Sequence, residues 1–156
     1  GELYKSQKAS RGTHIVFTRD RRPVAGAMLL SNIEDTRVSF VIPREDFGPG
    51  AVIVGTTDAS SPPDPADVRA EDEDVAYLLR LLARYFPDAK LGPTDILAKY
   101  VGVRPLMDPA FGRDEESGGG GGSLSKVSRE HHIDRGPGVS TLVAGGKYTN
   151  QRTMAR

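Results

Sequence analysis

A single amphipathic helix constrains the fold of this chain more than any other feature. Between residues 75 and 86, apolar side chains recur at helical spacing and share one face. That face consists of Val75, Leu78, Leu79, Leu82 and Phe86. Acidic residues at positions 71–74 precede the helix, where its N-terminus favours them, and Pro87 ends it. Since this is the one clear amphipathic helix, we expect it to pack on a sheet.

Short β-rich apolar runs lie on both sides of this helix. They occupy residues 14–17, 25–30, 37–42 and 51–54 before it, and 95–107, 126–133 and 139–144 after it. We expect the first run to be buried on both faces of the sheet, because it is mostly apolar. The pattern predicts an α+β fold, in which one amphipathic helix packs on a mainly antiparallel sheet of about six strands.

The composition excludes several classes of function. Twenty-one basic and 21 acidic residues give a net charge of +0. The net charge therefore provides no overall electrostatic attraction to nucleic acid. The absence of cysteine excludes disulfides and thiolate metal sites. His131 and His132 are adjacent and would face opposite sides of a strand, so we expect no metal site. No apolar run approaches the roughly 20 residues that span a bilayer.

A strand-to-helix junction near the end of the chain has the features of an anion site. The apolar run ends in Gly145 and Gly146, Lys147 follows, and a polar segment then opens a helix. Such a junction presents backbone N–H groups and a positive helix end, to which Lys147 adds a full charge. The alternative, a tight turn with a solvated lysine, stays open.

Two arginines in strands strengthen the case for an anionic ligand. Arg104 lies inside an apolar run, and Arg129 is central to another. If these strands are neighbours, both cations converge with Lys147, and a phosphate suits such a set. The alternative is that the arginines pair with carboxylates of this chain, namely Asp95, Asp108 or Glu130.

His14 and residues 56–58 are further candidates. His14 begins the first apolar strand after a glycine turn and is either a structural residue or a proton acceptor beside a substrate hydroxyl. Thr56, Thr57 and Asp58 follow a strand. They form an ordinary polar turn, bind a small molecule or hold a neighbouring arginine.

The order of the motifs carries a resemblance to a known family. In sequence they are RGTHIVF (11–17), VSFVIP (38–43), IVGTTD (53–58), YLLRLLARYFPDAKL (77–91), DILAKYVGVRPL (95–106), KVSREHHI (126–133) and VAGGKYTNQRTMA (143–155). Together they resemble the C-terminal part of the catalytic region of the quinone-linked, FAD-dependent glycerol-3-phosphate dehydrogenases. GTTD, GVRPL and AGGK in this order are specific, whereas each alone is weak.

The resemblance implies an activity and roles for individual residues. The activity is oxidation of sn-glycerol 3-phosphate to dihydroxyacetone phosphate, with FAD as cofactor and a membrane quinone as electron acceptor. By the same resemblance, His14 lies near the reacting carbon. The substrate-binding residues are Arg104, Arg129, Lys147 and Asp58. The cofactor-binding residues are Gly145, Gly146 and Thr149.

Two departures from the family lead us to expect a fragment. The N-terminal glycine-rich FAD fingerprint and the C-terminal helical extension are both missing. We therefore expect residues 1–144 to form a substrate-binding cap domain, with a glycine-rich loop at 112–125, and residues 145–156 to be the last segment of an FAD-binding domain. The rest of that domain would be a required partner, so the chain alone would be inactive and would not hold FAD tightly.

The resemblance also bears on location and leaves alternatives open. It implies a cytoplasmic enzyme associated with the inner face of the membrane, and a homodimer is left open. A glycerol-3-phosphate oxidase that uses oxygen shares the same motifs. From a different class, a non-catalytic module that binds a phosphorylated ligand also fits the glycine run and the absent nucleotide fold.

Overall fold

The computed structural model describes residues 7–21, 24–35, 37–62, 64–107, 131–135, 138–145 and 148–155. The glycine run at 118–122 lies outside these ranges, as do Arg129, Gly146 and Lys147. The chain divides into two compact units, one of residues 11–103 and one of residues 1–10 with 104–156. The boundary expected at residue 144 stays a prediction.

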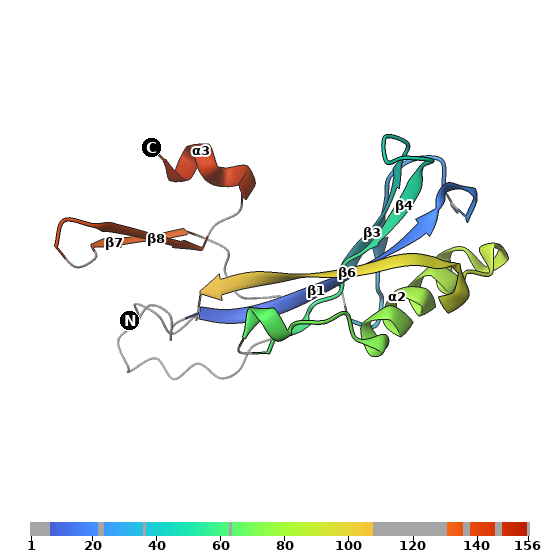
Figure 1. Ribbon diagram of the computed structural model, residues 1–156, viewed down its shortest axis with the longest axis horizontal. Coiled ribbons are helices and arrows are strands. Elements are labelled where there is room, and N and C mark those ends of the chain that lie inside the picture. Colours follow the sequence, from blue (N-terminus) through green and yellow to red (C-terminus); the bar gives the residue numbers. More distant parts are fainter. Residues whose placement is uncertain are drawn as a thin grey trace. The chain divides into compact units, whose positions relative to one another are not determined.

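Six strands form the main sheet (Figure 1). They are β1 (Gln7–Thr18), β2 (Met28–Ser31), β3 (Val38–Arg44), β4 (Ala51–Gly55), β5 (Ala59–Ser60) and β6 (Ile96–Met107). The order is β2-β3-β4-β1-β5, and β6 also pairs with β1. Strands β2–β3, β3–β4 and β4–β1 are antiparallel neighbours. This sheet and its helix confirm the predicted α+β class.

Helix α2 (Asp72–Tyr85) packs on one face of this sheet. The core contains Ile15, Phe17, Leu30, Val41, Val52 and Val54 from the strands, and Val75, Leu78, Leu81 and Leu82 from the helix. Leu81 is only 4% exposed, whereas Leu79, which the sequence placed on the apolar face, is partly buried. A helical stripe is wide enough to include either leucine, and docking on the sheet selects Leu81.

Strand β1 differs from its prediction in length and in burial. It begins at Gln7, so Gly12 lies within the strand and not in a turn that precedes it. Ile15 and Phe17 are fully buried, but His14 and Val16 are only partly buried. The prediction of burial on both faces was therefore wrong, because the helix covers one face and the alternating residues point to the other.

The remaining elements are short. β7 (His131–Arg135) and β8 (Thr141–Gly145) form a separate antiparallel two-stranded sheet. The 3-10 turns are η1 (Arg19–Arg21), η2 (Pro65–Asp67), η3 (Pro87–Ala89), η4 (Pro93–Asp95) and η6 (Tyr148–Asn150), and α3 spans Gln151–Met154. Among the helices of the described ranges, none is long and apolar enough to cross a membrane.

The carboxylate of Asp95 fixes the start of β6 and makes a pH dependence predictable. It accepts a hydrogen bond from the Gly92 N–H at 2.8 Å and pairs with Arg21 at 3.0 Å. The Gly92 bond and then Arg21 hold the pKa of Asp95 below its usual range. Because this pKa is lower in the folded state, the stabilisation is present above the ordinary aspartate pKa and is lost as pH falls through the lowered one.

An NMR titration of the side-chain carboxyls checks this prediction. We expect the Asp95 midpoint to lie below that of an unstructured aspartate, and Arg21→Ala to raise it only in part, because the Gly92 bond remains. A midpoint in Arg21→Ala that reaches the ordinary value would contradict the larger role of the backbone bond.

Candidate functional site

The His14 side chain on β1 lies in a slot between residues of β4 and β6, the strands that pair with β1. It is the cross-strand partner of Gly55 in β4, and its ring lies against this glycine. A Cβ at position 55 would come within 2.7 Å of the His14 Cγ and 2.9 Å of Nε2. On β6, the Tyr100 ring stacks on the imidazole with centroids 4.7 Å apart and planes inclined by 4°. The imidazole is thus held between the Gly55 backbone and an aromatic ring.

The slot belongs to the sheet face that α2 does not cover. Cross-strand pairs place Phe40 beside Gly55, and Ile53 beside both Val16 and Ile42, on this face. These apolar side chains are partly buried. Such a face can cover a flat apolar ligand, and His14 provides it with one group able to accept a proton.

The segment after β4 is fixed along β1 beside His14. The Thr57 N–H donates to the Thr13 carbonyl at 3.3 Å, and the Thr13 N–H donates to the Thr57 hydroxyl oxygen at 2.9 Å. Both threonines are buried. Asp58 follows, and its backbone carbonyl accepts a hydrogen bond from Arg37 at 2.8 Å. Asp58 therefore does hold a neighbouring arginine, through its main chain, while a role for its carboxylate in substrate binding stays a prediction.

Arg37 links Asp58 to the helix, and the sequence did not single it out. Its guanidinium pairs with Asp35 at 2.9 Å and lies 5.3 Å from the centroid of the Tyr77 ring. The Tyr77 hydroxyl donates to Asp35 and accepts from Asn32. Burial raises the pKa of Tyr77, so this hydroxyl keeps its proton and remains a donor. The sequence feature that could have indicated Arg37 is its position just after an acidic hairpin turn.

Asp74 anchors the strand that carries His14. It lies in the first turn of α2, and its carboxylate accepts hydrogen bonds from Arg11 at 3.0 Å and from the Thr13 hydroxyl at 2.9 Å. Thr13 directly precedes His14, so this pair of contacts fixes the backbone at the slot. The sequence indicated only a favourable charge at a helix N-terminus.

Arg104 lies in β6 and is partly buried. Its Nη1 donates to the Ser10 hydroxyl oxygen at 3.4 Å. Asp95, one of the carboxylates considered as its partner, pairs with Arg21 instead. A planar guanidinium in a strand remains suited to a phosphate.

The predicted cofactor residues lie at the end of the chain. β8 ends at Gly145, η6 includes Thr149, and α3 begins at Gln151, which matches the predicted strand-to-helix junction. The Thr149 side chain is exposed. Cofactor binding by Gly145 and Thr149 stays a prediction. Within the described ranges, no three His, Asp or Glu side chains gather closely enough to hold a metal ion.

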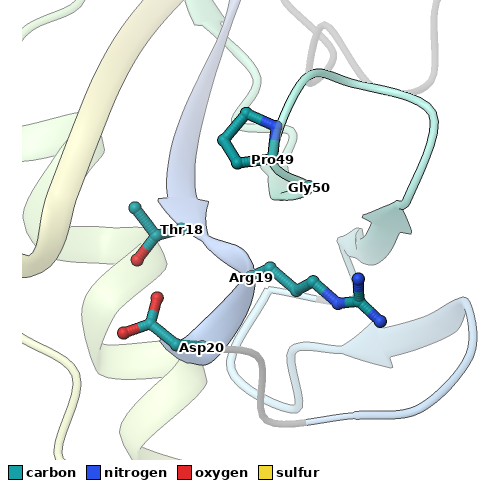
Figure 2. A pocket seen from close by; sticks show the side chains of 5 residues that line it. All are labelled: Thr18, Arg19, Asp20, Pro49 and Gly50. Carbon is teal, nitrogen blue, oxygen red and sulfur yellow. The ribbon is translucent and has the colours of Figure 1, made fainter.

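An open pocket of about 650 Å³ lies at the C-terminal end of β1 (Figure 2). The described residues that line it are Thr18, Arg19, Asp20, Pro49 and Gly50. Thr18 and Asp20 lie on one side of the strand, whereas Arg19 points away from them and pairs with Glu45 at 2.9 Å. None of these described lining residues is a predicted site residue.

Comparisons with known proteins point to one family. The sequence model described as "FAD dependent oxidoreductase" matches residues 2–152. An "Aerobic glycerol-3-phosphate dehydrogenase" of Staphylococcus saprophyticus is 32% identical over 151 residues, covering 97% of this chain and 25% of the relative. An "Alpha-glycerophosphate oxidase" of Streptococcus pyogenes is 33% identical over 135 residues, covering 86% of this chain and 21% of the relative.

A solved structure agrees with these relatives. The glycerol-3-phosphate dehydrogenase from Bacillus halodurans complexed with FAD superposes with a TM-score of 0.73 and is 30% identical. The match covers 96% of this chain and 25% of that chain, so the present chain spans about a quarter of the length of the relatives it matches. These similarities confirm the resemblance drawn from the motifs.

Proposed function

Because the chain belongs to the FAD-dependent oxidoreductase family, we propose that it is the substrate-binding part of an FAD-dependent glycerol-3-phosphate dehydrogenase. The observation that carries this proposal is the likeness to the FAD-complexed Bacillus halodurans enzyme over almost the entire chain. The reaction is oxidation of sn-glycerol 3-phosphate to dihydroxyacetone phosphate. Bound FAD supplies the acceptor for the hydride.

His14 is the proposed proton acceptor in this reaction. Oxidation of a secondary alcohol removes a hydride from carbon and a proton from the hydroxyl, and a carbonyl remains. An imidazole on the face not covered by α2 can take that hydroxyl proton at a ring nitrogen. Its apolar neighbours Phe40 and Val16 help to keep water from the reacting atoms.

The other predicted site residues bind the substrate phosphate, support the site or bind the cofactor. Arg104, Arg129 and Lys147 bind the substrate phosphate, because guanidinium forks and an ammonium match its oxygens. Asp58 supports the site from the segment that follows β4. The cofactor-binding residues are Gly145, Gly146 and Thr149.

The proposed reaction needs more protein than this chain. We propose that residues 1–144 form the substrate-binding domain and that residues 145–156 are the last segment of an FAD-binding domain. The enzyme works in the cytoplasm at the inner face of the membrane, where quinone takes the electrons. The name of the Streptococcus pyogenes relative favours oxygen as the alternative acceptor. Oxygen consumption during turnover, measured without added quinone, distinguishes these two acceptors.

Substitution of Arg104 by alanine tests the proposal. In the FAD-loaded enzyme that contains this chain, we expect Arg104→Ala to weaken binding of glycerol 3-phosphate by about 1.5–3 kcal/mol, as for hydrogen bonds to a charged group. Steady-state oxidation of glycerol 3-phosphate and of glycerol should show that the loss is confined to the phosphorylated substrate.

Arg80→Ala is the matched control, because this arginine is exposed on α2. It removes an equal charge and should leave the oxidation of both substrates unchanged. If Arg104→Ala binds glycerol 3-phosphate as well as the unmodified enzyme does, Arg104 is not a phosphate ligand. If the unmodified, FAD-loaded enzyme does not oxidise glycerol 3-phosphate, the proposed function is wrong.

A further inference from the structure

The stacking of Tyr100 on His14 is not explained by core packing. Tyr100 lies on the sheet face opposite α2, and 46% of it is exposed. Neither the buried core cluster nor the partly buried apolar residues packed against it include Tyr100. Its close and nearly parallel contact is with the imidazole, at 4.7 Å between centroids and 4° between planes. The ring therefore acts on His14 more than on the fold.

An imidazole without such neighbours has no fixed plane. The terminal torsion of histidine is broad and roughly two-fold, so a ring on an open sheet face samples several orientations. Tyr100 selects the orientations parallel to its own plane. Gly55 adds the second boundary, since only a residue without Cβ leaves room for the ring atoms that lie against it.

We propose that Tyr100 and Gly55 are positioning residues for His14, and that they fix the plane and position of its imidazole for removal of the substrate hydroxyl proton. This inference rests on the proposed function. Proton transfer requires the ring nitrogen and the hydroxyl to align within hydrogen-bond reach, and small displacements of reacting groups lower the rate strongly. The effect should therefore fall on kcat and not on binding of the substrate.

Tyr100→Leu and Tyr100→Phe, compared in the FAD-loaded enzyme, test the proposal. The energy of one stacked aromatic pair corresponds to about a 3- to 10-fold change in rate. We therefore expect Tyr100→Leu to lower kcat per bound FAD by that factor. Its KM should stay within about 2-fold of the KM of the unmodified enzyme. Tyr100→Phe keeps the ring and should restore kcat to the unmodified value. Tyr85→Leu, which removes a similarly exposed tyrosine on α2, should leave kcat unchanged.

NMR of the histidine rings provides a readout that does not depend on activity. The chain has three histidines, so the ring protons of His14 can be assigned by His14→Gln. We expect these protons to be shifted by the Tyr100 ring current in the unmodified chain and in Tyr100→Phe, but not in Tyr100→Leu. Equal His14 shifts in all three proteins would overturn the stacked geometry.

Gly55→Ala is a second and stronger perturbation. The added methyl group would occupy the place of the imidazole, and a displacement of about 1 Å can lower kcat by about 100-fold. Unchanged kcat in both Tyr100→Leu and Gly55→Ala, with normal turnover of the unmodified enzyme, would overturn the positioning role alone. An unmodified enzyme that binds FAD without oxidising glycerol 3-phosphate would overturn the proposed function and this inference with it.

Discussion

Replacing Asp74 by alanine is expected to lower the free energy of unfolding by about 3–5 kcal/mol, the usual cost of removing one partner from a buried ion pair. The side chain of Asp74 is 9% exposed, and that of its partner Arg11 is 17% exposed. Alanine leaves the Arg11 guanidinium without its carboxylate and the buried Thr13 hydroxyl without its acceptor. Urea denaturation followed by circular dichroism measures the change.

Asp72→Ala is the control for this measurement. Asp72 also lies in the first turn of α2 and pairs with Lys99 at 3.1 Å, but its side chain is 99% exposed. Both substitutions remove a negative charge from the same helix end, so the dipole contribution is matched. An exposed pair contributes about 0–1 kcal/mol, and Asp72→Ala should cost no more than that. Similar losses in the two variants would show that burial of Asp74 does not matter.

Asp74→Asn separates charge from hydrogen bonding. The amide oxygen can still accept from the Thr13 hydroxyl, but it no longer pairs as an anion with Arg11. We expect a loss smaller than that of Asp74→Ala. Because Thr13 precedes His14, the alanine variant should also disturb the His14 slot, which NMR of the His14 ring protons would detect.

Replacing Leu78 by alanine is expected to cost about 2–5 kcal/mol of unfolding free energy. Leu78 is fully buried between α2 and the sheet, among Phe17, Val54 and Leu82 of the core cluster. Alanine leaves a cavity that the close-packed strands cannot fill without moving. The same urea titration measures this loss, and an unchanged slope m indicates that the variant still unfolds from a compact native state.

Leu97→Ala is the matched control for Leu78→Ala. It removes the same atoms from a leucine that is 63% exposed on β6. Since those atoms are largely in water already, we expect a loss below about 1 kcal/mol. Equal losses at the two positions would contradict the assignment of the α2 face that packs on the sheet.

Much of the fold could be predicted from local sequence patterns. The helix at 72–85 and the strands around residues 38–44, 51–55 and 96–107 carry the periodicity of their own secondary structure. Strand β1 was predicted too short, because its first residues are polar and carry little apolar signal. The separate pairing of β7 with β8 could not be predicted, since strand partners are not encoded in the strands' own periodicity.

The candidate site likewise contains some residues that could be predicted from the sequence and others that could not. His14, Asp58 and Arg104 could be selected because each is a polar residue in or just after an apolar strand. Tyr100, Arg37 and Asp74 could not, because their importance comes from partners that are distant in sequence. The Thr13–Asp74 contact, for example, joins residues 61 positions apart. Only the register of the paired strands and the docking of α2 bring such groups together.

The sequence by itself determined the class of fold, the helix that organises it and the family to which the motifs belong. These properties depend on the spacing of apolar residues and on short motifs, which are local. The tertiary structure alone decided which sheet face α2 covers, and therefore on which side His14 lies. It also decided that Gly55 and Tyr100 enclose the imidazole, because a slot between strands exists only when the strands pair in one register.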